Sequence, residues 1–184
     1  MPSTVTVCLF ALNYHYDQNE DLWLAAVRLE RRHEGGGKQA LALMAKALQQ
    51  SECPSSGKLW AEAISTEARP QQKSRSVDAL KKCDNNPHVI VAVACLFMRD
   101  RKFEKARSWF NRAVTLDPDN GDAWASYLRF ATLHGKGEDE KESLLKRAVA
   151  ADPRHGDLWC KAKKGVENCH ASTEAVMIKV AQTM

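Results

Sequence analysis

The apolar residues of this chain recur at helical spacing and are separated by short polar turns. From His88 to about Met98 the chain is apolar on nearly every side, as expected of a helix packed between neighbours. The turn Arg99–Lys102 follows, and Asp117-Pro118 ends a second helix, because proline lacks the N–H group and disfavours helix in the residue before it. The second helix has the i, i+3, i+4, i+7 spacing of one buried face, formed by Phe103, Ala106, Trp109, Phe110, Ala113 and Val114. The pattern predicts a hairpin of two helices that is too small to bury its own apolar faces.

The same pattern returns along the chain, and a tryptophan near the start of the first helix marks most of its copies. Trp23 and Trp159 lie 136 residues apart across four intervals, so the mean period is 34 residues. This is the length of a tetratricopeptide (TPR) helix-turn-helix repeat. We therefore expect an all-α, right-handed superhelical solenoid of about five repeats. The positions expected to build it are Trp23, Trp60, Ile90, Trp124 and Trp159 in first helices, Ala106 and Ala113 in second helices, and Pro118 and Pro153 after them.

The period also predicts the organisation of the chain. We expect one continuous array over residues 1–184, because a solenoid has no separate cores. Residues 1–16 are interpreted as the second helix of a repeat whose first half is missing, which would make the chain the tail of a longer array. A frayed terminus or an N-terminal cap is the alternative. The last helix is expected to cap the array. The complete repeats are predicted at residues 20–50, 57–83, 87–117, 121–151 and 156–182.

Three local details are predicted specifically. Arg69-Pro70 is expected to end the first helix of the second repeat, at Lys58–Ala68. Its second helix, Ser74–Cys83, is expected to turn Val77, Leu80 and Cys83 inward. In the fifth repeat the first helix is expected to extend over Asp157–Asn168.

Composition and charge narrow the classes of function. The net charge is only +4, which is low for an unaided general nucleic-acid binder. The sequence contains no run of about 18 apolar residues, the length that a membrane-spanning helix requires. No membrane partner is therefore expected. The six cysteines form no CxxC pair and are interpreted as reduced thiols of a nuclear or cytosolic protein.

The sequence contains no catalytic or metal-binding motif. Cys160, Cys169 and His170 lack the four ligands in paired short spacings that structural zinc requires. Gly35–Lys38 has neither the Ser or Thr after the lysine nor the preceding strand of a phosphate-binding loop. We therefore expect a protein that is not an enzyme and has no metal, no cofactor and no small-molecule substrate.

A set of basic residues is predicted on the concave surface, which the first helices line in such arrays. The ninth and thirteenth positions of each unit, counted from three residues before the tryptophan, are expected to face inward. One hypothesis is that the cations at these positions bind an acidic segment of a partner protein, because arginine makes forked contacts with carboxylates. The alternative is that they only keep the array soluble. These cations, called the basic row below, are Arg28, Arg32, Arg69, Arg99, Arg129 and Lys164, with Asp21, Asp122, Asp157 and Glu167 as acidic neighbours. The tryptophans are expected to be buried rather than exposed for stacking on RNA bases.

Two features resemble the half-a-tetratricopeptide (HAT) repeats of RNA-processing proteins. Glu30 and Glu67 follow Trp23 and Trp60 by seven residues, although Ala131 stands at the corresponding place after Trp124. The second helices carry the basic-Ala pairs Lys46-Ala47, Arg112-Ala113 and Arg147-Ala148. The segments Leu43–Phe97, KARSWFNRAV, GDAWA and PRHGDLWC resemble more closely the C-terminal region of the pre-mRNA-splicing factor 6 family, HAT-repeat proteins of the spliceosomal tri-snRNP.

This resemblance covers about Leu22 to Cys160, and the family proteins are several times longer. It implies a nuclear, non-catalytic scaffold in pre-mRNA splicing that helps to assemble the tri-snRNP through spliceosomal snRNP proteins. The basic clusters at 81–82, 99–107 and 161–164 leave room for peripheral contact with RNA. Two alternatives remain open: a general TPR peptide-binding adaptor of the cochaperone type, or an RNA-binding HAT protein of another RNA-processing complex.

Overall fold

The computed structural model describes residues 19–33, 36–49 and 56–184. The described residues form helices and turns without any strand, which confirms the predicted all-α class. The helix expected within residues 1–16 lies outside the described residues. The chain divides into two compact units, Met1–Val89 and Ile90–Met184.

The first unit contains two helical hairpins. The helices α2 (Glu20–Arg32) and α3 (Gly37–Gln49) form one hairpin, and α4 (Gly57–Thr66) and α5 (Arg69–Lys82) form the other. Polar side chains cap the first helices: Asn19 accepts hydrogen bonds from the N–H groups of Asp21 and Leu22, and Ser56 accepts one from Leu59. The apolar faces of the hairpins share a core that includes Trp23, Val27, Ala40, Met44, Leu59 and Ala63.

Two predicted details of the second hairpin are wrong. Arg69 and Pro70 form the first turn of α5 instead of ending α4, because the missing N–H of proline is not needed in a first turn. Val77 is 50% exposed, whereas Gln72 and Ser76 are buried. These polar side chains tolerate burial because both bond to backbone carbonyl groups, Gln72 to Glu67 at 2.9 Å and Ser76 to Lys73 at 2.7 Å.

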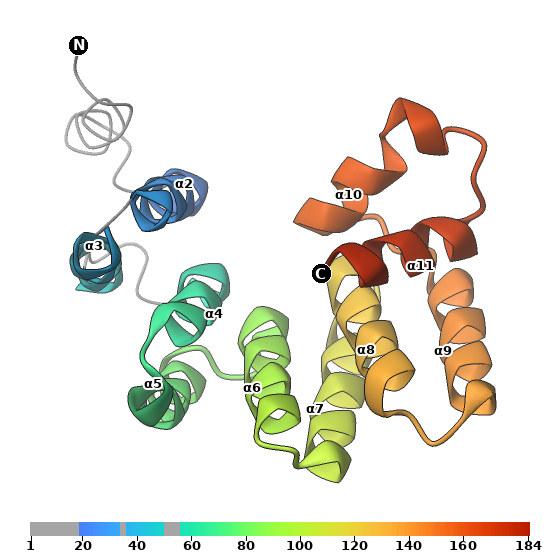
Figure 1. Cartoon of the computed structure of the whole chain (residues 1–184), viewed down its shortest axis with the longest axis horizontal. Coiled ribbons are helices and arrows are strands. Elements are labelled where there is room, and N and C mark those ends of the chain that lie inside the picture. The colour runs from blue at the N-terminus through green and yellow to red at the C-terminus, as the bar shows by residue number, and fades with distance from the viewer. Residues whose placement is uncertain (1–18, 34–35, 50–55) are drawn as a thin grey trace. The chain divides into compact units, whose positions relative to one another are not determined.

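The second unit contains most of α6 (Pro87–Arg99), which crosses the unit boundary, and all of the following helices. These are α7 (Phe103–Leu116), α8 (Gly121–His134), α9 (Glu138–Ala151), α10 (Asp157–Lys163), the short 3-10 helix η1 (Val166–Asn168) and α11 (Thr173–Thr183). Its core is aromatic around Phe110, Tyr127 and Phe130, and it extends to Trp159 and Met177. The last helix α11 packs against α8, α9 and α10, and Figure 1 shows it running across the ends of α8 and α9.

The first helix of the last repeat is shorter than predicted. It ends at Lys163 rather than at Asn168, and the chain then forms η1. The carbonyl group of Ala162 accepts a hydrogen bond from the N–H of Gly165 at 3.2 Å and from the side-chain amide of Asn168 at 2.7 Å. These bonds satisfy an end carbonyl of α10 in the way that helix caps do, so the helix stops there.

Successive hairpins within each unit are joined by hydrogen bonds between residues about one repeat apart. Arg28 and Glu62 are 34 residues apart, Arg107 and Glu140 are 33 apart, and Asp122 and Trp159 are 37 apart. These separations are those expected of stacked repeats with a period of 34. The hairpins are therefore stacked repeats inside each unit, while the right-handed superhelix and the single continuous array stay predictions.

The junction between the fourth and fifth repeats shows why tryptophan and proline recur together. The indole N–H of Trp124 donates to the carbonyl of Pro118 at 2.8 Å, and that of Trp159 donates to the carbonyl of Pro153 at 2.7 Å. The carboxylate of Asp122 accepts hydrogen bonds from the N–H groups of Leu158 at 3.2 Å and Trp159 at 2.8 Å. Each proline thus ends one repeat and anchors the indole of the next, and Asp122 holds the start of α10.

Candidate partner-binding surface

The three cations of the basic row in the first unit are exposed, but they differ in their contacts. Arg28 binds the carboxylate of Glu62 through Nε at 3.1 Å and Nη2 at 3.0 Å, and Arg31 binds the same carboxylate at 3.0 Å. The charge of Arg28 is therefore matched within the unit. Arg32 and Arg69 have no ion-pair partner among the described residues, so their guanidinium groups are available to a ligand.

In the second unit Arg99, Arg129 and Lys164 are exposed as well. Burial raises the pKa of the Cys95 thiol, while the positive charges of Arg99 and Arg129 both lower it. Arg99 on α6 and Arg129 on α8 therefore lie close to the same thiol. Within the described part of the chain neither arginine forms an ion pair, and neither does Lys164, which follows directly after α10.

The acidic neighbours of the basic row are mostly engaged inside the fold. Asp21 contacts Lys58 at 3.4 Å, and Asp122 caps α10. Glu167 contacts Lys179 at 2.7 Å, which lowers the pKa of the glutamate. Asp157 is exposed and has no hydrogen-bond or ion-pair partner among the residues that the structure describes. These contacts leave the basic row with more unmatched positive charge than the sequence alone indicates.

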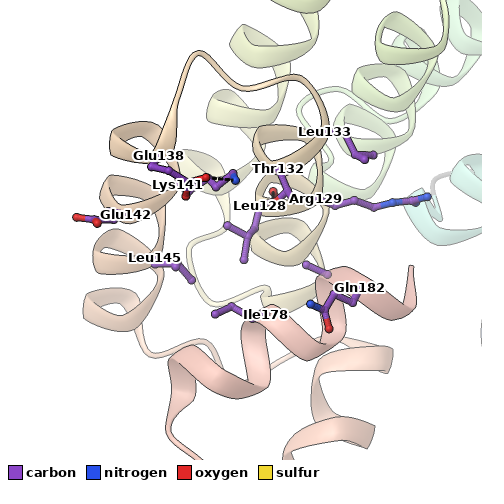
Figure 2. A pocket seen from close by; sticks show the side chains of 11 residues that line it. Leu128, Arg129, Thr132, Leu133, Glu138, Lys141, Glu142, Leu145, Ile178 and Gln182 are labelled. Atoms are coloured by element: carbon purple, nitrogen blue, oxygen red, sulfur yellow. Dashed lines mark hydrogen bonds and ion pairs between the residues drawn. The ribbon is translucent and has the colours of Figure 1, made fainter.

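A groove in the second unit lies beside Arg129 and has a volume of about 530 Å³ (Figure 2). It is formed by α8, α9 and α11, and five of its lining residues are apolar. Leu133 is 57% exposed and Ile178 is 38% exposed, so the groove presents aliphatic surface to solvent. The lining residues are Leu128, Arg129, Thr132 and Leu133 of α8, Glu138, Lys141, Glu142 and Leu145 of α9, and Ile178, Ala181 and Gln182 of α11.

The charges around this groove are unequally matched. Lys141 forms an ion pair with Glu138 at 2.7 Å, and Glu142 contacts Lys146 at 3.7 Å. Figure 2 shows Arg129 extending away from α8 without a contact to the other labelled residues. The lining residue whose charge is unmatched is therefore basic, and its side chain points away from Leu145 and Ile178, at the edge of the groove.

The tryptophans that mark the repeats are buried, with 0% exposure for Trp23 and Trp159 and at most 7% for the other two. Lys46 Nζ lies 6.0 Å from the centroid of the Trp23 ring, and the guanidinium carbon of Arg147 lies 5.5 Å from that of Trp124. These cation–π contacts give two of the basic-Ala pairs a role that the sequence reasoning missed. The basic residue lies over the tryptophan of its own repeat, and the alanine beside it is buried. Rings that are buried in this way cannot stack on RNA bases.

No set of three or more His, Cys, Asp or Glu side chains among the described residues is placed to hold a metal ion. None of the helices in this part of the chain is both long enough and apolar enough to cross a membrane. The described residues offer a ligand exposed guanidinium groups and, beside Arg129, an aliphatic groove, a combination suited to a protein segment with carboxylates.

No family model matches the chain. Protein STABILIZED1 of Arabidopsis thaliana is 49% identical over 116 residues, which cover 63% of this chain and 11% of that protein. Pre-mRNA-processing factor 6 of Homo sapiens is 55% identical over 75 residues, 41% of this chain and 8% of that protein. Pre-mRNA-splicing factor prp1 of Schizosaccharomyces pombe is 41% identical over 127 residues, 69% of this chain and 14% of that protein. The matches thus span 8–14% of the length of these relatives.

One solved structure has a weaker similarity. YrrB, a TPR protein described as having an unusual peptide-binding site, aligns with 96% of this chain and 90% of its own at 16% identity and a TM-score of 0.49. A match at this level does not bear on peptide binding by the present chain. The sequence relatives, in contrast, confirm the resemblance predicted from the sequence. Over part of its length the chain is a homologue of the pre-mRNA-processing factor 6 proteins.

Proposed function

We propose that this chain is a non-catalytic protein-interaction scaffold that acts in pre-mRNA splicing. The observation that carries this proposal is the similarity to proteins of a plant, human and fission yeast, two of which are named as pre-mRNA processing or splicing factors. The stacked hairpins support it, because repeat arrays present extended helical surfaces on which protein partners bind.

The family resemblance makes the proposal more specific. The chain acts in the nucleus and helps to assemble the spliceosomal tri-snRNP by contacting snRNP proteins. The basic row supports a partner with acidic segments, because all of its members except Arg28 lack an ion-pair partner among the described residues. Exposed arginines can bind carboxylates in the forked geometry that favours them over lysine.

Affinity purification tests this function directly. The tagged chain is incubated with nuclear extract, with and without ribonuclease, and the bound proteins and RNAs are identified. Recovery of snRNP proteins in both arms is expected. Chaperones as the sole bound proteins would favour a cochaperone-like adaptor instead. Loss of all bound proteins after ribonuclease treatment would favour an RNA-binding protein.

Charge reversal tests the role of the basic row in the same assay. We expect the triple variant Arg32→Glu, Arg69→Glu and Arg99→Glu to lose snRNP proteins, because each change puts a carboxylate where the partner's acidic groups bind. The matched control reverses Lys81, Lys105 and Lys161, which are exposed cations outside the row. Circular dichroism checks that both variants stay folded. Equal loss in both variants would show that only net charge matters and would refute a specific role for the row.

A further inference from the structure

The groove between α8, α9 and α11 has the size and surface of a binding site for part of another protein. Its volume of about 530 Å³ lies within the range of roughly 300–1,000 Å³ that is typical of ligand sites. Leu128 and Ala181 are buried, and Leu133 and Ile178 stay substantially exposed. Exposed aliphatic side chains beside a concave apolar surface gain free energy when a partner covers them.

The walls of the groove indicate which kind of protein segment fits. All three walls are α-helices, whose backbone groups bond within the helix, so no open strand edge is present for strand addition. None of the lining residues is aromatic, whereas grooves that bind polyproline segments are lined by aromatic side chains. Among the modes of peptide recognition that depend on apolar contact, these walls fit an amphipathic helix that lays its apolar face into the groove.

The charges of the lining residues indicate which charged side chain the partner helix carries beside its apolar face. Lys141 is matched by Glu138 and Glu142 by Lys146, but Arg129 has no ion-pair partner in the described part of the chain. A carboxylate on the partner helix would therefore be attracted to Arg129, and a basic residue there would be repelled.

We propose that this groove binds an amphipathic helix of a protein partner, with aliphatic side chains of its apolar face against Leu133 and Ile178 and a carboxylate against Arg129. This inference rests on the proposed scaffold function, because it names the class of segment that one part of the scaffold receives. It also gives Arg129 a binding role that the other residues of the basic row do not share, because only Arg129 lines the groove.

The test is selection from a phage-displayed library of random peptides on a helical framework, with the purified full chain as bait. Peptides with aliphatic residues at i, i+3 or i+4 and a neighbouring Asp or Glu are expected. A synthetic copy of the selected peptide is then titrated against the variants by fluorescence anisotropy. Arg129→Glu is expected to weaken its binding about tenfold, because it replaces an attractive charge with a repulsive one. Leu133→Asp is expected to have at least as large an effect, because it puts a charge on the apolar surface.

The matched control is Lys161→Glu, which reverses an exposed cation that belongs neither to the groove nor to the basic row. It is expected to leave peptide affinity unchanged. Thermal unfolding followed by circular dichroism confirms that each variant is folded, and Ile178→Asp provides a second change in the groove on a different helix. Arg129→Glu should also select basic peptides in a repeated screen.

Two outcomes would overturn the proposal. One is failure of the library to yield aliphatic, acidic helices that depend on Leu133 and Ile178. The other is equal weakening by Arg129→Glu and Lys161→Glu, which would show general attraction of acidic peptides. The selection uses no nuclear protein, so it can fail while the chain still recovers snRNP proteins from extract. The two proposals therefore fail independently.

Discussion

At the scale of single residues, the hydrogen bonds of the indole N–H groups explain the recurrence of tryptophan better than the burial of its apolar ring does. An apolar core position accepts several large side chains, but only tryptophan reaches the proline carbonyl six residues earlier, as at Trp124 and Trp159. This bond joins the end of one repeat to the first helix of the next. The recurrence of tryptophan at these positions follows from a hydrogen bond as well as from burial.

Substitution of Trp159 should separate these two contributions. Trp159→Phe keeps a buried ring but leaves the carbonyl of Pro153 without its donor, and we expect a loss of about 1–2 kcal/mol in the free energy of unfolding. Trp159→Ala also leaves a cavity and should cost about 3–5 kcal/mol. Urea unfolding followed by circular dichroism measures both.

Trp109 provides the control for this prediction. It is partly buried beside Phe97, with a ring-centroid distance of 5.9 Å, and no described residue accepts a hydrogen bond from its indole N–H. Trp109→Phe is therefore expected to cost less than Trp159→Phe. Equal losses would show that ring size alone, and not the bond to proline, accounts for the tryptophan.

Whether the sequence predicts the burial and the partner of a side chain depends on what that side chain contacts. Periodicity predicts the burial of Trp124 and Ala113, because apolar spacing reports which face of a helix is buried. The partner of Arg28 could not be predicted, because Glu62 belongs to another hairpin and the contact depends on how the two hairpins are aligned. Gln72 was missed for a different reason, since its burial depends on a hydrogen bond to a backbone carbonyl.

At the scale of helices, Asp122 connects two first helices. Its carboxylate accepts two N–H groups at the start of α10, although it belongs to α8. We expect Asp122→Ala to destabilise the fold by about 1 kcal/mol, the usual effect of losing a side chain that caps a helix start. Asp157→Ala removes the aspartate at the equivalent place in the last repeat, which caps no described helix, and should change stability little. Thermal unfolding of the two variants compares them, and similar losses would contradict the capping role.

The ion pair between α7 and α9 should make stability depend on pH. Arg107 binds Glu140 through Nε at 2.7 Å and Nη2 at 3.3 Å, and this hydrogen bonding lowers the pKa of Glu140. A lowered pKa in the folded state means that the carboxylate stabilises the fold above its unfolded pKa of about 4.3. This contribution is lost as pH falls through the lower, folded-state value.

The measurement is the urea midpoint between pH 7 and pH 3. Glu140→Gln is expected to lower the midpoint at pH 7 and to reduce its fall in acid, because the variant has no carboxylate to protonate. In an Arg107→Gln background the same substitution should alter the pH dependence much less. An unchanged acid profile in Glu140→Gln would show that other carboxylates dominate.

The helices themselves were largely predictable, and their ends less so. A period of 34 residues and a proline after a second helix determine which segments pair into hairpins. The start of α5 was placed five residues too late, at Ser74 rather than Arg69, because proline ends some helices and begins others. The early end of α10 depends on the side chain of Asn168 folding back on Ala162, which no periodic pattern reports.

At the scale of the whole molecule, the basic row and the groove differ in how much the sequence predicts. Repeat positions alone placed Arg99 and Arg129 among the exposed cations, because equivalent positions in stacked hairpins face the same way. The groove was not predicted, since it exists only because α11 crosses α8 and α9. That crossing departs from the regular order of repeats, and it brings Ile178 to the groove that Leu133 lines.

A repeat protein should also respond locally to damage, because each repeat contacts only its neighbours and stability is approximately a sum of repeat and junction terms. Trp60 is buried in α4, so Trp60→Ala should increase amide hydrogen exchange most in α4 and α5. The increase should diminish along the chain towards α9 and α11. Trp124→Ala is the reciprocal control, with its largest expected increase in α8 and α9. Hydrogen exchange followed by mass spectrometry resolves both patterns. If either variant raised exchange equally in all helices, the repeats would unfold as one cooperative core, and the nearest-neighbour account of the fold would be wrong.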